Sequence, residues 1–205
     1  GLKHEQLDEK DLRTPHSAQN LFWTVIEEVS NDPDIGLHLG EKIPVFKGQV
    51  LEYLFLISET FGEGLKRALS YQRLLSDAVN ATLEEDEIGL YVGNISFTGG
   101  FRHLTECVVI AVLKFFDYVT EGAFQPLEIH FEHAMGDNPQ EYKRVFPCPV
   151  KFEQAGNRIY FTADSLNVAS SHAEPELLKL HEQLANEHVA KLEKQDFIAK
   201  VNRLI

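Results

Sequence analysis

The chain has 205 residues, of which 43% are hydrophobic, and this is enough to bury one sizeable core in one domain. Asp and Glu number 32 against 19 Lys and Arg, so the net charge of −13 makes the chain alone a poor binder of nucleic-acid phosphates. The two cysteines, Cys107 and Cys148, are too few and too far apart for a disulfide framework or a zinc site with paired thiolates, which favours the cytosol.

No segment has the pattern of a membrane span or a signal peptide. The longest apolar run, 107–119, is interrupted by Lys114 and Asp117 and is shorter than the roughly 20 residues that a bilayer requires. The N-terminal stretch GLKHEQLDEKDLR has no apolar core. We therefore expect a cytoplasmic location and no membrane contact.

The first third of the chain has the apolar spacing of helices. Apolar side chains recur on one helical face through 18–30, and the Asn-Asp-Pro at 31–33 ends the pattern. A short segment bounded by glycines follows at 34–40. Residues 49–59 are apolar on most sides and predict a buried helix.

Thr60 and Glu63 have the spacing of a capping box, in which side chain and backbone satisfy one another at a helix start. The helix that they open is expected to continue to residue 80. Its inward side chains would be Leu65, Leu69, Leu75 and Val79.

From residue 81 the apolar period changes to two. Residues 81–85 and 88–97 predict a β-hairpin that ends at the Thr-Gly-Gly of 98–100. Residues 102–120 then predict a helix that is apolar nearly all round and therefore central.

The clearest strand is 127–133, in which apolar and polar residues alternate. The expected core face comprises Leu127, Ile129 and Phe131, and the expected wet face comprises Glu128, His130 and Glu132. A short helix is expected at 139–146, a second hairpin from 150–153 and 158–161, and a long last helix at 174–205.

About six helices and five short strands, mostly in hairpin order, predict an α+β fold. We expect it to be mostly helical, with a small antiparallel sheet of about five strands around a central apolar helix.

The stretch FPCPVKF at 146–152 predicts a sharp joint between a helix and a strand. Pro147 prevents the helix from continuing, and Pro149 fixes an extended entry to a strand whose Val150 and Phe152 face the core. No cationic neighbour in the sequence would lower the pKa of Cys148, so it is expected to be a small buried hydrophobe and not a nucleophile.

The same stretch, together with three others, resembles a known family. A helix that ends in Phe and continues as Cys-Pro-Val-x-Phe occurs with DPDIGL at 32–37 followed by Gly40, with TFGEGLKRALSYQRLLSDAV at 60–79, and with QPLEI at 125–129. These motifs, in this order, resemble the arabinose-binding-like N-terminal domain of AraC-type transcriptional regulators, in the subgroup of ornithine- and arginine-utilisation regulators. The resemblance covers about residues 20–205.

The resemblance implies that residues 1–205 form a single effector-binding and dimerisation domain. Such regulators carry a C-terminal helix-turn-helix DNA-binding domain, which is absent from this chain, and FIAKVNRLI at 197–205 looks like the lead into it. DNA would then be contacted only through that missing domain. One departure is the run 166–169, Leu-Asn-Val-Ala, where the family usually has a proline after the Leu.

Six residues are candidates for contact with a small-molecule effector: Tyr71, Arg73, Tyr91, Phe97, Arg102 and His103. Arg73 is suited to a ligand carboxylate, or else to an ion pair with Asp77 one turn away. Arg102 and His103 begin the central helix, where anions are favoured, although ordinary capping is the alternative. Tyr91 and Phe97 share a predicted strand face with Ile95 and would line a cavity or simply pack in the core.

The last helix is expected to form a homodimer interface. Phe197 and Val201 recur at helical spacing, as do Leu177, Leu180 and Leu184 earlier in the helix. One apolar stripe would contact the sheet and the other a second copy, since homodimers are the commonest assembly.

No catalytic residue, metal or cofactor is expected. His130 and His133 are three apart on a predicted strand and so point to opposite faces, and His181-Glu182 has Ala at 185 where a zinc-protease motif needs a second His. The alternative functions are a ligand-independent interaction or dimerisation module and an unrecognised enzyme. An enclosed cavity with one or two polar residues would favour sensing, whereas a filled core with an exposed apolar patch would favour the interaction module.

Overall fold

The structure is a computed structural model that describes residues 18–77, 79–95 and 101–202. Its helices are α1 (Ala18–Ser30), α2 (Ile35–Lys42), α3 (Val50–Leu56), α4 (Phe61–Ser70), α5 (Arg102–Val119), α6 (Pro139–Val145) and α7 (Pro175–Asn202), with two short 3-10 helices, η2 (Gln72–Leu74) and η3 (Ala163–Asn167). Its strands are β1 (Thr82–Glu85), β2 (Leu90–Gly93), β3 (Pro126–His130), β4 (Val150–Lys151) and β5 (Arg158–Phe161). The predicted α+β class is confirmed.

The five strands form one sheet in the order β1-β2-β5-β3-β4. Every pair is antiparallel except β3 with β4, which is parallel. The predicted hairpin of β1 and β2 is confirmed. The predicted hairpin of β4 and β5 is wrong, because β3 lies between them and pairs with both. The Ile129 N–H of β3, for example, donates to the Pro149 carbonyl at 2.9 Å.

Strand β3 ends three residues earlier than expected, and its two faces differ from a simple alternation. Ile129 and Phe131 are fully buried as predicted, but Leu127 is 41% exposed. The pairing of β3 with β5 shifts between Pro126 and Glu128, so Leu127 is the extra residue of a bulge and leaves the core. The predicted wet face is also partly covered, because His130 packs against Tyr160 with ring centroids 4.8 Å apart.

One helix lies in a segment for which no helix was predicted, and one predicted helix ends early. The segment 34–40 forms most of α2, in which Gly36 lets the helix approach α5 closely: a Cβ atom there would lie 2.5 Å from the Cα of His103. The helix opened by Thr60 ends at Ser70, ten residues before the expected end. There the chain tightens into η2, and the side-chain amide of Gln72 exchanges two hydrogen bonds with the backbone of Ala81, which directs the chain into β1.

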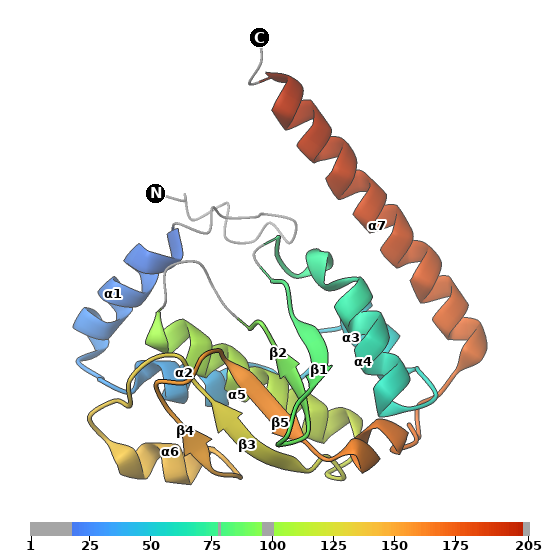
Figure 1. Cartoon of the computed structure of the whole chain (residues 1–205). Coiled ribbons are helices and arrows are strands. Elements are labelled where there is room, and N and C mark those ends of the chain that lie inside the picture. Colours follow the sequence, from blue (N-terminus) through green and yellow to red (C-terminus); the bar gives the residue numbers. More distant parts are fainter. Residues whose placement is uncertain (1–17, 78, 96–100, 203–205) are drawn as a thin grey trace.

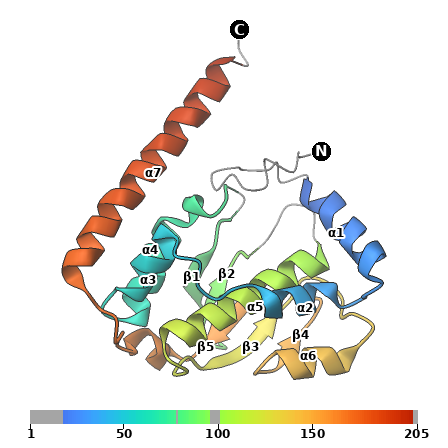
Figure 2. The ribbon, with the colours of Figure 1, turned by 180° about the vertical axis from the view of Figure 1, so that it is seen from behind.

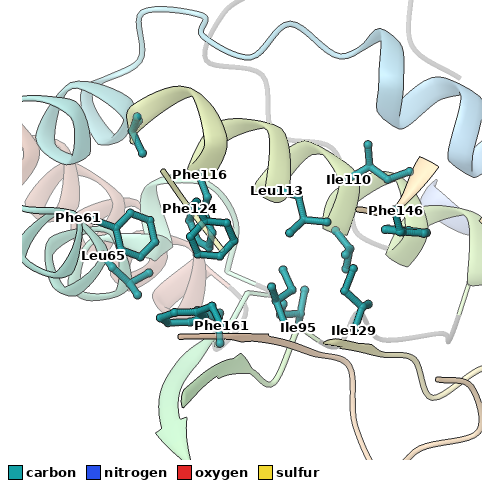
Figure 3. Packing of buried hydrophobic residues seen from close by; sticks show 14 of the residues in the cluster. Phe61, Leu65, Ile95, Ile110, Leu113, Phe116, Phe124, Ile129, Phe146 and Phe161 are labelled. Carbon is teal, nitrogen blue, oxygen red and sulfur yellow. The ribbon is translucent and has the colours of Figure 1, made fainter. Parts of the chain in front are cut away.

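Helix α5 crosses one face of the sheet, as its all-round apolar sequence predicts (Figures 1 and 2). Helices α1, α2 and α6 lie toward one end of α5 and α3 and α4 toward the other, while α7 extends away from the body. Figure 3 shows side chains of α4 and α5 pointing to those of the sheet. The core is rich in aromatic rings, and the ring of Phe61 contacts those of Phe116, Phe124 and Phe161.

The helix-to-strand joint at 146–152 is confirmed. Helix α6 ends at Val145, Phe146 is buried, and β4 begins at Val150. Cys148 packs against the core, and burial raises the pKa of its thiol to about 11. The thiol is therefore protonated at neutral pH, which agrees with the expected packing role.

Candidate functional site

A cavity of about 310 Å³ lies between α3 and α4 on one side and α5 on the other. Strand β2 with the residues after it, the stretch between α4 and β1, and the segment before α3 complete its walls. Three of its lining residues, Leu65, Ile95 and Phe116, belong to the core shown in Figure 3, so the cavity continues that core toward the surface. Its volume is at the lower end of the range for small-molecule sites.

The lining of this cavity is almost entirely apolar. Helix α5 contributes Val108, Ala111, Val112 and Phe115, and the remaining wall is largely aliphatic. The polar exceptions are Lys47, Gln49, Glu52, Gln72 and Asn94. Lys47, Gln49 and Asn94 are exposed, so the cavity opens to solvent near them.

Most of these polar side chains already bond the protein itself. Gln72 uses both ends of its amide on the backbone of Ala81. One oxygen of Glu52 accepts from the backbone N–H groups of Lys47 and Gln49, at 2.8 and 3.0 Å, and so fixes the start of α3. The Asn94 amide donates to the Thr82 hydroxyl at 3.0 Å.

Lys47 is different, because its ammonium group has no carboxylate partner among the described residues. Burial raises the pKa of the Cys107 thiol to about 11, and the positive charge of Lys47 acts against that rise. Lys47 itself lies in the segment before α3 and lines the cavity where the cavity opens to solvent.

Tyr71 and Arg73, predicted as effector contacts, do not line the cavity. The Tyr71 hydroxyl donates to Asn186 Oδ1 at 3.0 Å, and the Arg73 guanidinium donates to Asp77 at 2.9 Å and to Asp196. The alternative prediction of an ion pair between Arg73 and Asp77 is confirmed. Both side chains reach toward α7, and it is their neighbour Gln72 that faces the cavity.

Tyr91 lies on the outer face of the sheet, away from the cavity. Its ring packs against Tyr160 at 5.0 Å and under the Arg158 guanidinium at 4.6 Å. The expected shared face with Ile95 is wrong, because Asn94 has a left-handed backbone with φ of 54°, which breaks the alternation after β2. Ile95 therefore lines the cavity without Tyr91. Phe97 lies outside the described residues.

Arg102 and His103 belong to a buried polar cluster at the start of α5, distant from the cavity lining. Arg102 donates to the Tyr142 hydroxyl at 3.5 Å. His103 Nδ1 accepts from the Gly36 N–H at 3.4 Å, which leaves Nε2 to carry the proton near Glu27 at 3.3 Å. The structure brings these two residues together with Glu106, and their binding of an anion stays a prediction.

Sequence reasoning missed most of the cavity and also Glu106. Glu106 is fully buried in α5 and accepts a hydrogen bond from Tyr142. A lone acidic residue in an otherwise apolar turn was a usable signal for such a cluster. The cavity residues carried no comparable signal, because apolar residues that line a void have the same spacing as those that fill a core.

The apolar residues predicted for a dimer interface are all on the exposed side of α7. Their exposed fractions run from 37% to 67% for Leu177, Leu180, Leu184, Phe197 and Val201. The opposite side of α7 buries Leu178 and Ala185 against Leu54 and Ile57 of the α3 region. The expected contact between α7 and the sheet is wrong, since α7 packs on α3 and η2.

The described residues contain no group of three or more His, Cys, Asp or Glu side chains placed to hold a metal ion. His130 is hydrogen-bonded to Glu128, and His133 stacks on Phe131 with centroids 4.7 Å apart. Within the described helices, none is both long and apolar enough to cross a membrane.

Comparisons with known proteins agree with the motifs. The family model for the N-terminal arabinose-binding domain of AraC transcription regulators matches residues 1–169. The chain is 22% identical over 208 residues to the ornithine utilization regulator of Pseudomonas aeruginosa, covering 100% of this chain and 61% of that protein. In fold it is similar to the crystal structure of the transcriptional regulator CdpR from Pseudomonas aeruginosa, with a TM-score of 0.60, 14% identity, and coverage of 86% of this chain and 58% of that chain.

The chain thus spans less than two thirds of the length of either relative. The family match extends over most of the described fold, from α1 through η3, and includes the segments that form the cavity. This chain belongs to the family of N-terminal arabinose-binding domains of AraC-type transcription regulators.

Proposed function

We propose that this chain is the effector-sensing and dimerisation domain of a cytoplasmic bacterial regulator of the AraC type. The observation that carries the proposal is the cavity of about 310 Å³ beside the core, with an apolar wall and a few polar residues at its mouth. A small molecule that binds one arrangement of the domain better than another would shift the population between them. A DNA-binding domain outside this chain would then respond to that shift.

An exposed apolar face on α1 favours a second candidate, a ligand-independent interaction module. Leu21, Phe22, Val25 and Val29 are 44% to 81% exposed, although Trp23 on the same helix is buried against α5. Such a face is typical of a contact with another protein. In this case the cavity would have no effector, and assembly alone would set the activity.

The sensing proposal predicts that the replacement Ala111→Phe blocks the cavity. Ala111 lies on the α5 wall and is only partly buried, so a phenyl ring there would occupy the void without displacing the core. The dye 1-anilinonaphthalene-8-sulfonate should bind the unchanged chain at one site, and the replacement should weaken that binding by more than about tenfold. Fluorescence titration measures both affinities.

The matched control is Ala155→Phe, which adds the same ring at an exposed position outside the cavity. It should leave the affinity for the dye unchanged. Equal dye affinities for Ala111→Phe and the unchanged chain would contradict the sensing proposal and favour the interaction module.

The dimerisation proposal predicts that the unchanged chain is a dimer and that the double replacement Leu180→Asp and Leu184→Asp is a monomer. Both leucines lie on the exposed side of α7, 58% and 38% exposed. A dimer interface would bury the introduced carboxylates without partners, which is strongly unfavourable. Analytical ultracentrifugation over a range of protein concentrations measures the association.

Met135→Asp is the control for the dimerisation prediction, because Met135 is a 48% exposed apolar residue outside α7. This variant should associate as the unchanged chain does. An unchanged chain that stays monomeric, or a double variant that still dimerises, would show that this side of α7 is not the interface.

A further inference from the structure

The wall of the cavity is complementary to a hydrocarbon group. Side chains from α5, such as Val108 and Val112, face Leu65, Ala68 and Leu69 of α4 across it. No charged or hydrogen-bonding side chain among the described residues interrupts this inner part of the lining. A ligand gains affinity here by removing apolar surface from water.

The polar residues at the mouth offer few bonds to a ligand. The Gln72 amide, one carboxylate oxygen of Glu52 and the Asn94 amide nitrogen are engaged within the protein. A sugar would bury several hydroxyl groups against aliphatic side chains, and each unpaired hydroxyl would weaken binding. A dibasic amino acid such as ornithine would carry two ammonium groups to a lining in which the described residues include one carboxylate, Glu52, and one oxygen of that carboxylate already bonds the backbone.

Among the described residues that line the cavity, Lys47 supplies the single formal positive charge. Its ammonium group is not paired with a carboxylate from the described part of the chain, and Lys47 is exposed where the cavity opens to solvent. An anionic group at the mouth would therefore meet a cation that requires no other bond to be broken. The rest of such a ligand would extend along the apolar wall.

We infer that the effector of this cavity is an apolar monocarboxylate, with its hydrocarbon body between α4 and α5 and its carboxylate at Lys47. This inference rests on the proposed sensing function and adds the chemical class of the effector. It predicts selectivity against sugars and against dibasic amino acids, although the names of the family and of one relative mention arabinose and ornithine.

The test is displacement of 1-anilinonaphthalene-8-sulfonate from the 205-residue chain by hexanoate, octanoate and decanoate. Affinity should rise by about fourfold for each added methylene group until the cavity is full. Decanol, which has the same tail and no charge, should bind about threefold to tenfold more weakly than decanoate, as expected for one partly exposed ion pair. L-Arabinose and L-ornithine should not displace the dye.

Variants of two lysines separate the head group from the tail. Lys47→Gln should lower the affinity for decanoate by about threefold to tenfold and leave that for decanol unchanged, and Lys47→Arg should restore binding of decanoate. Lys66→Gln is the matched control, because Lys66 is an exposed lysine of α4 outside the cavity lining. It should change neither affinity.

The outcomes distinguish this inference from the function on which it rests. Displacement of the dye by arabinose or ornithine, or affinities that do not rise along the series of acids, would overturn the ligand class and leave the sensing function standing. The ligand class would also be overturned, with the sensing function left standing, if Ala111→Phe prevents dye binding but none of the acids displaces the dye. If Ala111→Phe leaves the affinity for the dye unchanged, the sensing function itself is overturned.

Discussion

The replacement Phe61→Ala should lower the free energy of unfolding by about 3–5 kcal/mol, the usual cost of removing a buried phenyl ring. Phe61 is 3% exposed and lies at the centre of the aromatic core, with ring centroids of Phe116 at 5.0 Å, Phe124 at 5.3 Å, Phe55 at 5.4 Å and Phe161 at 6.0 Å. The replacement would remove the common neighbour of four rings, which come from α3, from α5, from the loop after α5, and from β5. These rings also pack against one another, so they cannot move to fill the cavity that the replacement leaves. Urea denaturation followed by circular dichroism measures the loss.

Phe22→Ala provides the comparison for Phe61→Ala. Phe22 is 50% exposed on α1, and the main contact of its ring is with Trp23 at 5.2 Å. Its replacement should cost about 1 kcal/mol or less. Similar losses for the two variants would contradict the placement of the core around Phe61.

The replacement Tyr142→Phe should destabilise the chain by about 1.5–3 kcal/mol, because it removes a hydrogen bond to a buried carboxyl group. The Tyr142 hydroxyl donates to Glu106 and accepts from the Gly136 N–H at 3.1 Å, and burial raises the pKa of Tyr142 well above its usual range. The other oxygen of Glu106 has no hydrogen-bond partner in the described part of the chain. Tyr142→Phe would remove the hydroxyl that donates to Glu106, so both oxygens of the buried Glu106 carboxyl group would lack a hydrogen bond.

Two comparisons test the cause of this loss. Tyr118→Phe removes a hydroxyl from a tyrosine that is 43% exposed, and it should change stability by less than about 0.5 kcal/mol. In a Glu106→Gln background, Tyr142→Phe should cost clearly less than in the unchanged chain, because the two residues act as a pair. Equal costs in both backgrounds would show that the hydroxyl does not depend on Glu106.

Local patterns predicted the elements of this fold well and their pairing less well. Helix α1 has the predicted bounds, and α5 is the predicted central helix, because apolar spacing and helix-ending residues are local properties. The hairpin of β4 and β5 failed because an alternating pattern fixes which face of a strand is buried and not which strand lies beside it. The bulge at Leu127 is likewise set by the register with β5 and leaves no mark in the sequence of β3 alone.

The candidate site was predicted at the level of segments and not of side chains. The segment that carries Tyr71 and Arg73 does border the cavity, but Gln72 is the residue that lines it. In a 3-10 helix successive side chains are about 120° apart. A side chain one residue away from Gln72 therefore points toward α7 and not into the cavity. Lys47 escaped notice because an exposed lysine in a loop has no pattern until the elements around it are placed.

The side chains of η2 and of Tyr71 before it connect the cavity to α7. Gln72 touches the cavity, while the residues on either side of it, Tyr71 and Arg73, are bound to Asn186 and Asp196 of α7. One short turn cannot rotate to suit a ligand without moving both of its flanking bonds. If the proposed effector moves Gln72, the position of α7 would therefore differ between the occupied and the empty cavity.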